Sequence, residues 1–106
     1  MSSITTHVLD TARGRPAQGI PVRLEGNGVE AEAVTDEDGR CRELGPDEIA
    51  AGTYQLVFGT ASYFESTGQQ GFFPEVIITF TIDDATQHYH VPLLISPYAY
   101  STYRGS

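Results

Sequence analysis

The sequence has little of what marks a membrane, secreted or disulfide-stabilised protein. Its 106 residues contain no apolar run of the roughly 18 residues that a membrane-spanning helix needs. The single cysteine, Cys41, excludes an internal disulfide framework and a thiolate metal cluster within one chain. The segment 1–7 has neither the basic nor the apolar region of a secretory signal. We therefore expect a cytoplasmic protein.

Positive charge is also scarce. Six Lys and Arg residues stand against fourteen Asp and Glu, which gives a formal net charge of −8. Binding to phosphate backbones needs a basic face, so nucleic acid is not an expected partner, and neither is a membrane. The acidic residues are dispersed along the chain and indicate a solubilising surface. Any local cluster of Arg and His stands out on such a surface.

Chain-reversing residues and alternating apolar residues are abundant. Eleven Gly and six Pro punctuate a pattern that has a period of two almost throughout, which is typical of half-buried strands. Residues 61–67 form the one stretch that suits a short helix. The pattern predicts an all-β protein of about eight strands in two packed sheets, with residues 1–106 as a single domain. The strands are expected at residues 4–10, 20–25, 30–35, 40–44, 54–58, 75–82, 87–95 and 98–104.

All three histidines are predicted to lie on an outer face. In the strand 87–95, His88 and His90 alternate with core-type residues, and His7 alternates with Thr6 and Val8 in the first strand. If these two strands share a sheet, the three imidazoles can meet on one face and exchange protons near neutral pH. Two alternatives stay open from the residues alone. Solvated or interface histidines give the same pattern, and three histidines can also bind zinc.

Arg40 follows the tight turn Asp38-Gly39 and is therefore held at the start of a strand. A guanidinium fixed in this way can bind a planar oxyanion through two parallel hydrogen bonds. The alternative is an ordinary surface arginine that pairs with nearby carboxylates. Cys41 is expected to point the other way, into the sandwich, as a small core residue.

The C-terminal segment 98–106 contains three tyrosines in its first six residues. Chain ends are usually polar and frayed, so these rings predict that the segment docks on something. We expect a homo-oligomer in which the outer faces of the last strands meet, with a site in the cleft between subunits.

Five segments together resemble the 5-hydroxyisourate hydrolases, the transthyretin-related enzymes of urate degradation. The resemblance covers essentially the whole chain, and its last two segments are the most specific. The segments are Thr6-His7-Val8-Leu9-Asp10, Thr35-Asp36-Glu37-Asp38-Gly39-Arg40, Phe72-Phe73-Pro74-Glu75, His88-Tyr89-His90-Val91-Pro92-Leu93-Leu94 and Tyr100-Ser101-Thr102-Tyr103-Arg104-Gly105-Ser106.

This resemblance implies a transthyretin-like (prealbumin-like) sandwich that assembles as a tetramer, a dimer of dimers, with active sites at the ends of an inter-dimer channel. The implied reaction is the hydrolytic opening of 5-hydroxyisourate to 2-oxo-4-hydroxy-4-carboxy-5-ureidoimidazoline, without metal or cofactor. The implied catalytic residues are His7, Arg40, His90 and Ser106. The implied substrate-binding residues are His7, Arg40, Tyr103 and His88.

Two other functions remain open from the sequence. The first is a non-catalytic transthyretin-like module that binds a small aromatic ligand in the channel. The second is a metal-dependent hydrolase that uses His7, His88 and His90. Proton-transfer groups favour the enzyme over the binding module, and activity that survives chelation would exclude the metal.

Overall fold

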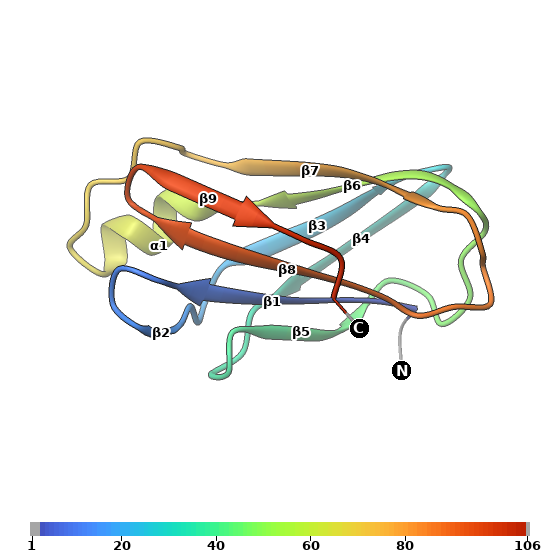
Figure 1. Cartoon of the computed structure of the whole chain (residues 1–106), viewed down its shortest axis with the longest axis horizontal. Coiled ribbons are helices and arrows are strands. Elements are labelled where there is room, and N and C mark those ends of the chain that lie inside the picture. Colours follow the sequence, from blue (N-terminus) through green and yellow to red (C-terminus); the bar gives the residue numbers. More distant parts are fainter. Residues whose placement is uncertain (1–2, 106) are drawn as a thin grey trace.

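A computed structural model describes residues 3–105 of the chain, which form two packed β-sheets and a short helix (Figure 1). The elements in chain order are β1 (Ile4–Asp10), β2 (Arg15–Pro16), β3 (Pro21–Gly26), β4 (Val29–Val34), β5 (Arg40–Leu44), β6 (Gly52–Phe58), α1 (Thr60–Ser66), β7 (Val76–Ile82), β8 (Tyr89–Ser96) and β9 (Ala99–Thr102). The predicted two-sheet sandwich is confirmed.

The first sheet has β1 at its centre. Its strand order is β2-β1-β8-β9, and β5 pairs with β1 on the same edge as β2 but at the other end of the strand. The β1–β8 pair is parallel, whereas β1–β5 and β8–β9 are antiparallel. The two strands that carry histidines are therefore immediate neighbours, as the sequence required for the imidazoles to meet.

The second sheet is antiparallel, with the order β4-β3-β6-β7. It lies behind the first sheet in Figure 1, and α1 covers one end of the sandwich. The inner faces of both sheets share one apolar core, in which Tyr54 and Phe58 are the largest fully buried side chains. Alternation puts every second residue of β1 into this core, so Thr5 and His7 lie on the outer face.

Two turns follow the predictions made from composition. Asn27 and Gly28 have φ angles of 52° and 80° and join β3 to β4 as a hairpin. Gly39 has a φ of 75°, and a Cβ there would lie 2.4 Å from the carbonyl oxygen of Val8. Only glycine fits so close to β1, and this contact fixes the start of β5 at Arg40.

The structure differs from the expected elements in three places. The two-residue strand β2 lies in what the sequence predicts as a turn, and it brings the strand count to nine among the described residues. The strand β8 begins at Tyr89, so His88 lies in the preceding loop. The last strand ends at Thr102, and beyond it the described chain pairs with β8 only at the isolated His90–Gly105 bridge, in the register of the β8–β9 pair. No helix within residues 3–105 is long and apolar enough to cross a membrane.

Candidate active site

The strand register brings the predicted residues to one region of the outer face of the first sheet. His7 on β1 lies opposite Arg40 on β5, and Thr5 on β1 lies opposite His90 on β8. Side chains that alternate to the same face of neighbouring strands come into contact range. Three segments far apart in the sequence thus present an imidazole pair and a guanidinium to the same surface.

A shallow pocket of about 240 Å³ lies on this surface. Two of its walls are Arg40 and His90, and His88 closes one end. The full lining is Thr5, Thr6, Arg40, Cys41, Arg42, His88 and His90. His7 does not line this pocket, but it is close enough for its charge to affect the pKa of His90. The structure therefore brings together four of the six predicted site residues.

Thr5 holds the two imidazoles of the pocket. Its Oγ1 lies 2.8 Å from Nδ1 of His90 and 2.9 Å from Nε2 of His88. Because Nδ1 of His90 is used in this contact, Nε2 is the nitrogen left for a ligand. Sequence reasoning missed Thr5, although alternation with Thr6 puts it on the same face as His7.

His7 has a defined tautomer. Its Nε2 lies 2.9 Å from the carbonyl oxygen of Asp38, which can only accept, so Nε2 carries the proton. In neutral His7, Nδ1 is then a lone pair that can take a proton. Burial, followed by the charge of Arg40, lowers the pKa of His7 below 6.5 despite the opposing contribution of Asp38. His7 is thus poised as a neutral base at pH 7.

His90 is also kept neutral. Burial is the main cause of its lowered pKa, and the charges of Arg40, His7 and His88 act in the same direction. Perturbed imidazoles beside a fixed cation are characteristic of sites that transfer protons.

Arg40 is positioned by the preceding turn. Its backbone N–H donates to Oδ1 of Asp36 at 3.0 Å, as does the N–H of Asp38 at 2.9 Å. Arg42, at the next outward position of β5, pairs with the carboxylates of Asp36 and Asp38. None of the ion pairs within residues 3–105 involves Arg40, although its charge contributes to the lowered pKa of Asp36.

The C-terminal segment follows β9 alongside β8 and reaches His90 at Gly105 (Figure 1). The Gly105 N–H donates to the carbonyl oxygen of His90 at 2.8 Å. The Arg104 guanidinium stacks over the ring of Tyr89 at 4.4 Å and bonds to the side chain of Gln87. The segment is therefore held against β8 through Gly105, whereas Tyr98, Tyr100 and Tyr103 are 70%, 43% and 60% exposed, so the predicted docking of these rings stays a prediction.

Tyr103 lies elsewhere within a single chain. It lines an apolar pocket of about 230 Å³ between the tail and β7, together with Ile78 and Phe80, and is 60% exposed. Its predicted contact with substrate therefore stays a prediction that involves assembly. The predicted role of Ser106 concerns a residue outside the described range 3–105.

Cys41 is no nucleophile. It is buried in the core, as alternation predicted, and burial raises the pKa of its thiol to about 11. Its charged form is therefore scarce at neutral pH.

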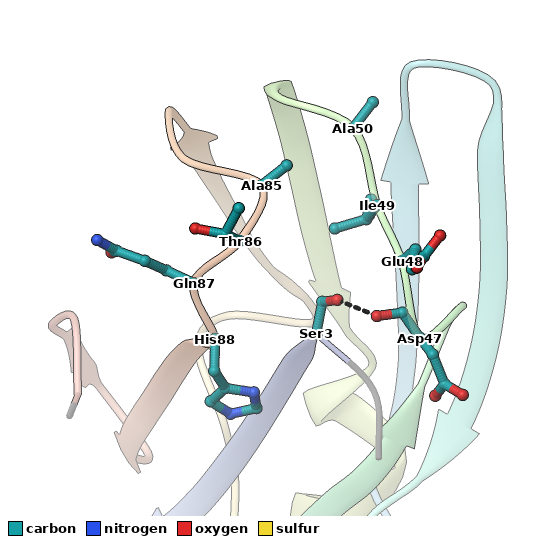
Figure 2. Close-up of a pocket in the computed structure, with 9 residues that line it drawn as sticks. All are labelled: Ser3, Asp47, Glu48, Ile49, Ala50, Ala85, Thr86, Gln87 and His88. Carbon is teal, nitrogen blue, oxygen red and sulfur yellow. Dashed lines mark hydrogen bonds between the residues drawn. The ribbon is translucent and has the colours of Figure 1, made fainter.

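A larger cleft opens beside the pocket, and His88 lines both (Figure 2). It has a volume of about 690 Å³ and lies between the loop that precedes β6 and the loop that precedes β8. Ser3 bonds across it to the Asp47 carbonyl oxygen. In Figure 2 the His88 imidazole points away from its loop neighbours, toward β1. The exposed His88 thus stands between the pocket and open solvent.

Residues 3–105 contain no group of three or more His, Cys, Asp or Glu side chains placed to hold a metal ion. In the zinc alternative the ligands would be His7, His88 and His90. Each of these rings uses one nitrogen in a hydrogen bond.

Comparison with known protein families gives a match along nearly the whole chain. The model of the HIUase/transthyretin family matches residues 4–105. A 5-hydroxyisourate hydrolase of Mus musculus is 48% identical over 113 residues, covering 99% of this chain and 96% of the relative. One of Pseudomonas aeruginosa is 47% identical over 117 residues, covering 100% and 93%.

Solved structures agree with this result. A 5-hydroxyisourate hydrolase of Klebsiella pneumoniae superposes with a TM-score of 0.88 at 38% identity, covering 97% of this chain and 98% of that one. Sea bream transthyretin in complex with thyroxine gives a TM-score of 0.87 at 26% identity, covering 97% and 94%. The fold is thus common to hydrolases and to a hormone-binding protein, and the residues of the site have to separate the two.

Proposed function

This chain belongs to the HIUase/transthyretin family, and from that premise we propose that it hydrolyses 5-hydroxyisourate in the pocket formed by Arg40, His88 and His90, with His7 beside it. The curated relatives named above match over nearly their full length as 5-hydroxyisourate hydrolases, so the chain is a hydrolase of that kind. Its reaction opens the ring to 2-oxo-4-hydroxy-4-carboxy-5-ureidoimidazoline, in urate degradation.

One observation carries the assignment of the site. Two imidazoles whose pKa values are lowered lie beside a guanidinium that has no carboxylate partner within residues 3–105. Ligand binding in a channel does not require groups that transfer protons at neutral pH. Ring opening needs them, together with a cation for the developing oxyanion.

The tautomers suggest how the roles divide. Neutral His7 carries its proton on Nε2, so its Nδ1 can accept a proton from water as the water attacks the carbonyl carbon. His90 presents Nε2 to the pocket and donates to the departing ring nitrogen. Arg40 binds the electron-rich ring and stabilises the oxyanion, an interaction worth about 3 kcal/mol in the transition state. His88, Tyr103 and Ser106 complete the proposed substrate contacts, and no metal or cofactor takes part.

We also propose a homotetramer whose subunits complete the site. Large apolar side chains are exposed toward the end of the chain, including Phe72, Tyr98 and Tyr103. Exposed apolar side chains that lie together mark interfaces, and here Phe72 packs on Phe73, which packs on Tyr100. Within such an assembly Tyr103 can reach a substrate bound by a neighbouring subunit. Sedimentation at micromolar concentration measures the oligomeric state directly.

The location and the domain organisation are also proposed. The buried, unpaired thiol of Cys41 suits a reducing compartment, and we propose a cytoplasmic location. Residues 1–106 are proposed to form one domain, because both sheets share a single core.

The direct test generates 5-hydroxyisourate in situ from urate and follows its loss, with product chirality read by circular dichroism. The wild-type rate is expected to exceed spontaneous decay by orders of magnitude, in buffer treated exhaustively with chelator. Arg40→Ala is expected to lower turnover by about 100-fold or more, because it removes the oxyanion contact. The matched control is Arg23→Ala on the second sheet, where the side chain pairs with the neighbouring Glu25.

Each rival has its own outcome. Decay no faster than the spontaneous rate would leave the family's other known role, ligand binding, as the better description. Loss of activity on chelation would restore the metal-dependent alternative. Near-normal turnover of Arg40→Ala would refute the site while leaving the activity intact.

A further inference from the structure

The hydroxyl of Thr5 lies between two imidazoles, and it can hydrogen-bond to both only by donating to one and accepting from the other. Its Oγ1 lies within hydrogen-bond distance of Nδ1 of His90 and Nε2 of His88. A threonine hydroxyl has one proton to donate. When it donates to His90, it must accept from His88, and when it donates to His88, it must accept from His90. The proton positions on the two rings are therefore linked through one oxygen.

His90 needs such a link to act as an acid. A neutral imidazole releases its N–H proton only with great difficulty, unless its other nitrogen gains a proton in the same step. The cationic form, which would donate readily, is disfavoured because burial and the charge of Arg40 lower the pKa of His90. The other titratable and charged groups that face the ring, from β1, β5 and the loop before β8, are His7, Arg42 and His88.

We propose that Thr5 and His88 form a proton relay to His90, in which His90 donates to the substrate from Nε2 while it is recharged at Nδ1. Thr5 is thus a positioning residue that acts through His90. This inference rests on the proposed hydrolysis and adds to it the route by which protons enter the site.

The proton transfers of the ring-opening step conserve atoms and charge. The Nε2–H bond of His90 breaks as its proton passes to the departing ring nitrogen, whose bond to the carbonyl carbon breaks. The Thr5 hydroxyl proton moves to Nδ1 of His90, and the Nε2 proton of His88 moves to Thr5. His88 takes a proton from solvent at Nδ1, so no ring is left negative. His7 holds the proton removed from the attacking water and returns it to solvent.

The position of His88 suits the solvent end of the proposed proton relay. It is exposed, and it lines both the catalytic pocket and the open cleft of about 690 Å³ shown in Figure 2. Its Nε2 faces Thr5, whereas its Nδ1 has no partner within residues 3–105 and can exchange with water in the cleft. His90, in contrast, is half-buried between β1 and the C-terminal segment.

The kinetic test compares Thr5→Val, which keeps the shape of the side chain but has no hydroxyl, with Thr5→Ser, which keeps the hydroxyl. Thr5→Val is expected to lower kcat about 10- to 100-fold with KM changed less than about threefold, and Thr5→Ser to restore most of kcat. The matched control is Thr11→Val, since Thr11 also donates from the β1 side to β8, at Ile95, away from the imidazoles. A Thr5→Val enzyme with wild-type kcat would overturn the relay.

The pH profile separates a relay from a structural role. Without Thr5, His90 can donate only as a cation, so kcat of Thr5→Val should fall about tenfold per pH unit as pH rises above the lowered pKa of His90. The wild type should stay level from pH 6.5 to 8. A loss of equal size at every pH would show that Thr5 merely supports the fold, and the proposal would then be wrong.

A measurement without substrate keeps the relay distinct from the activity. In ¹⁵N spectra at pH 7.5, His88→Gln should shift the Nδ1 resonance of His90 in the wild-type background but not in Thr5→Val. Absence of this coupling in the wild type would overturn the relay even in an active enzyme. Presence of the coupling in a protein that fails to hydrolyse 5-hydroxyisourate would instead overturn the proposed function.

Discussion

At the scale of single residues, Gly105 is the sharpest test of how the tail supports the site. A Cβ at this position would lie 2.6 Å from Cδ2 of His90 and 3.3 Å from Cγ of both His90 and Pro92. The clash is with an imidazole that can rotate. Gly105→Ala is therefore expected to displace His90 without unfolding the sheet.

The expected loss in kcat for Gly105→Ala is about 10- to 100-fold, because a misplacement of about 1 Å at a reacting group costs that much. The melting temperature should change little, and the ¹⁵N resonances of His90 should move. Wild-type turnover, or a large fall in melting temperature with unchanged His90 resonances, would contradict this account.

The residues of the site divide by how far the sequence could predict them. Alternation alone put His7 and His90 on outer faces, since each is flanked by core-type residues. The resemblance added Arg40, whose pattern by itself was that of a surface arginine. Thr5 could not be singled out, because threonine is ordinary in strands and its role depends on a parallel partner 85 residues away. The crowding at Gly105 is equally invisible without coordinates.

At the scale of elements, α1 is fastened to β1 by one buried carboxylate. Tyr63 Oη donates to Oδ2 of Asp10 at 2.7 Å, and Gln69 Nε2 donates to the same oxygen at 3.1 Å. Burial would raise the pKa of Asp10, but these bonds and that from the Arg13 N–H outweigh it and lower the pKa. The group is charged and fully hydrogen-bonded, which is the condition for burying it at low cost.

Asp10→Ala is expected to destabilise the fold by about 2–3 kcal/mol, since it leaves several buried donors without an acceptor. Tyr63→Phe removes one bond and should cost only about 1 kcal/mol. Denaturant unfolding measures both, and turnover at low temperature should stay near the wild-type value in each. Equal effects of the two changes would show that the carboxylate does not anchor the helix.

The tail is an element of the site rather than of the fold. Residues 103–105 bridge to His90 through the backbone, stack Arg104 on Tyr89, bond to Gln87 and line a pocket beside β7, whereas β9 is paired with β8 independently of them. Deletion of residues 103–106 is therefore expected to abolish hydrolysis and to leave the circular dichroism spectrum of the sandwich intact. A truncated tetramer that retains activity would show that the tail is dispensable.

Most elements followed from the period of two, and the misses have physical reasons. The strand β2 is two residues long, and its Arg15 and Pro16 have the composition of a turn, so no periodicity could reveal it. The last strand was expected to continue to Arg104. Its residues are exposed throughout, and after Thr102 the chain pairs with β8 only at the Gly105–His90 bridge, which keeps the register of the β8–β9 pair. Pairing order and the parallel contact of β1 with β8 are properties of topology, which alternation does not encode.

At the scale of the whole molecule, the site makes stability depend on pH. His7 and His90 have folded-state pKa values below the unfolded value of 6.5. The unfolded chain therefore binds protons first as pH falls. The contribution of these groups to the free energy of unfolding is present above about pH 6.5 and is lost as pH falls through their folded pKa values. Asp10, Asp36 and Asp84 have pKa values lowered from 3.8, so their contribution is lost only below that pH.

The melting temperature should consequently be level above about pH 7, fall in a first step below pH 6.5, and fall again below about pH 4. The formal net charge of −8 acts the other way, since acid reduces self-repulsion on approach to the pI of about 4.5. The measurement should be made by calorimetry in about 0.15 M salt, where the Debye length is about 8 Å. Salt at this concentration screens the repulsion due to the net charge and leaves the effect of the individual histidines and carboxylates.

Two variants separate the histidines from the remaining charge. The double change His7→Asn with His90→Asn should remove the first step and keep the second, because neutral amides do not titrate. Arg40→Ala should shrink the first step without removing it, because burial is the larger cause of both lowered pKa values and the charge of Arg40 the next. A wild-type melting temperature that stays level from pH 8 to pH 5 would mean that the two imidazoles titrate alike in the folded and unfolded chain. That result would also remove the electrostatic basis for keeping them neutral at the site.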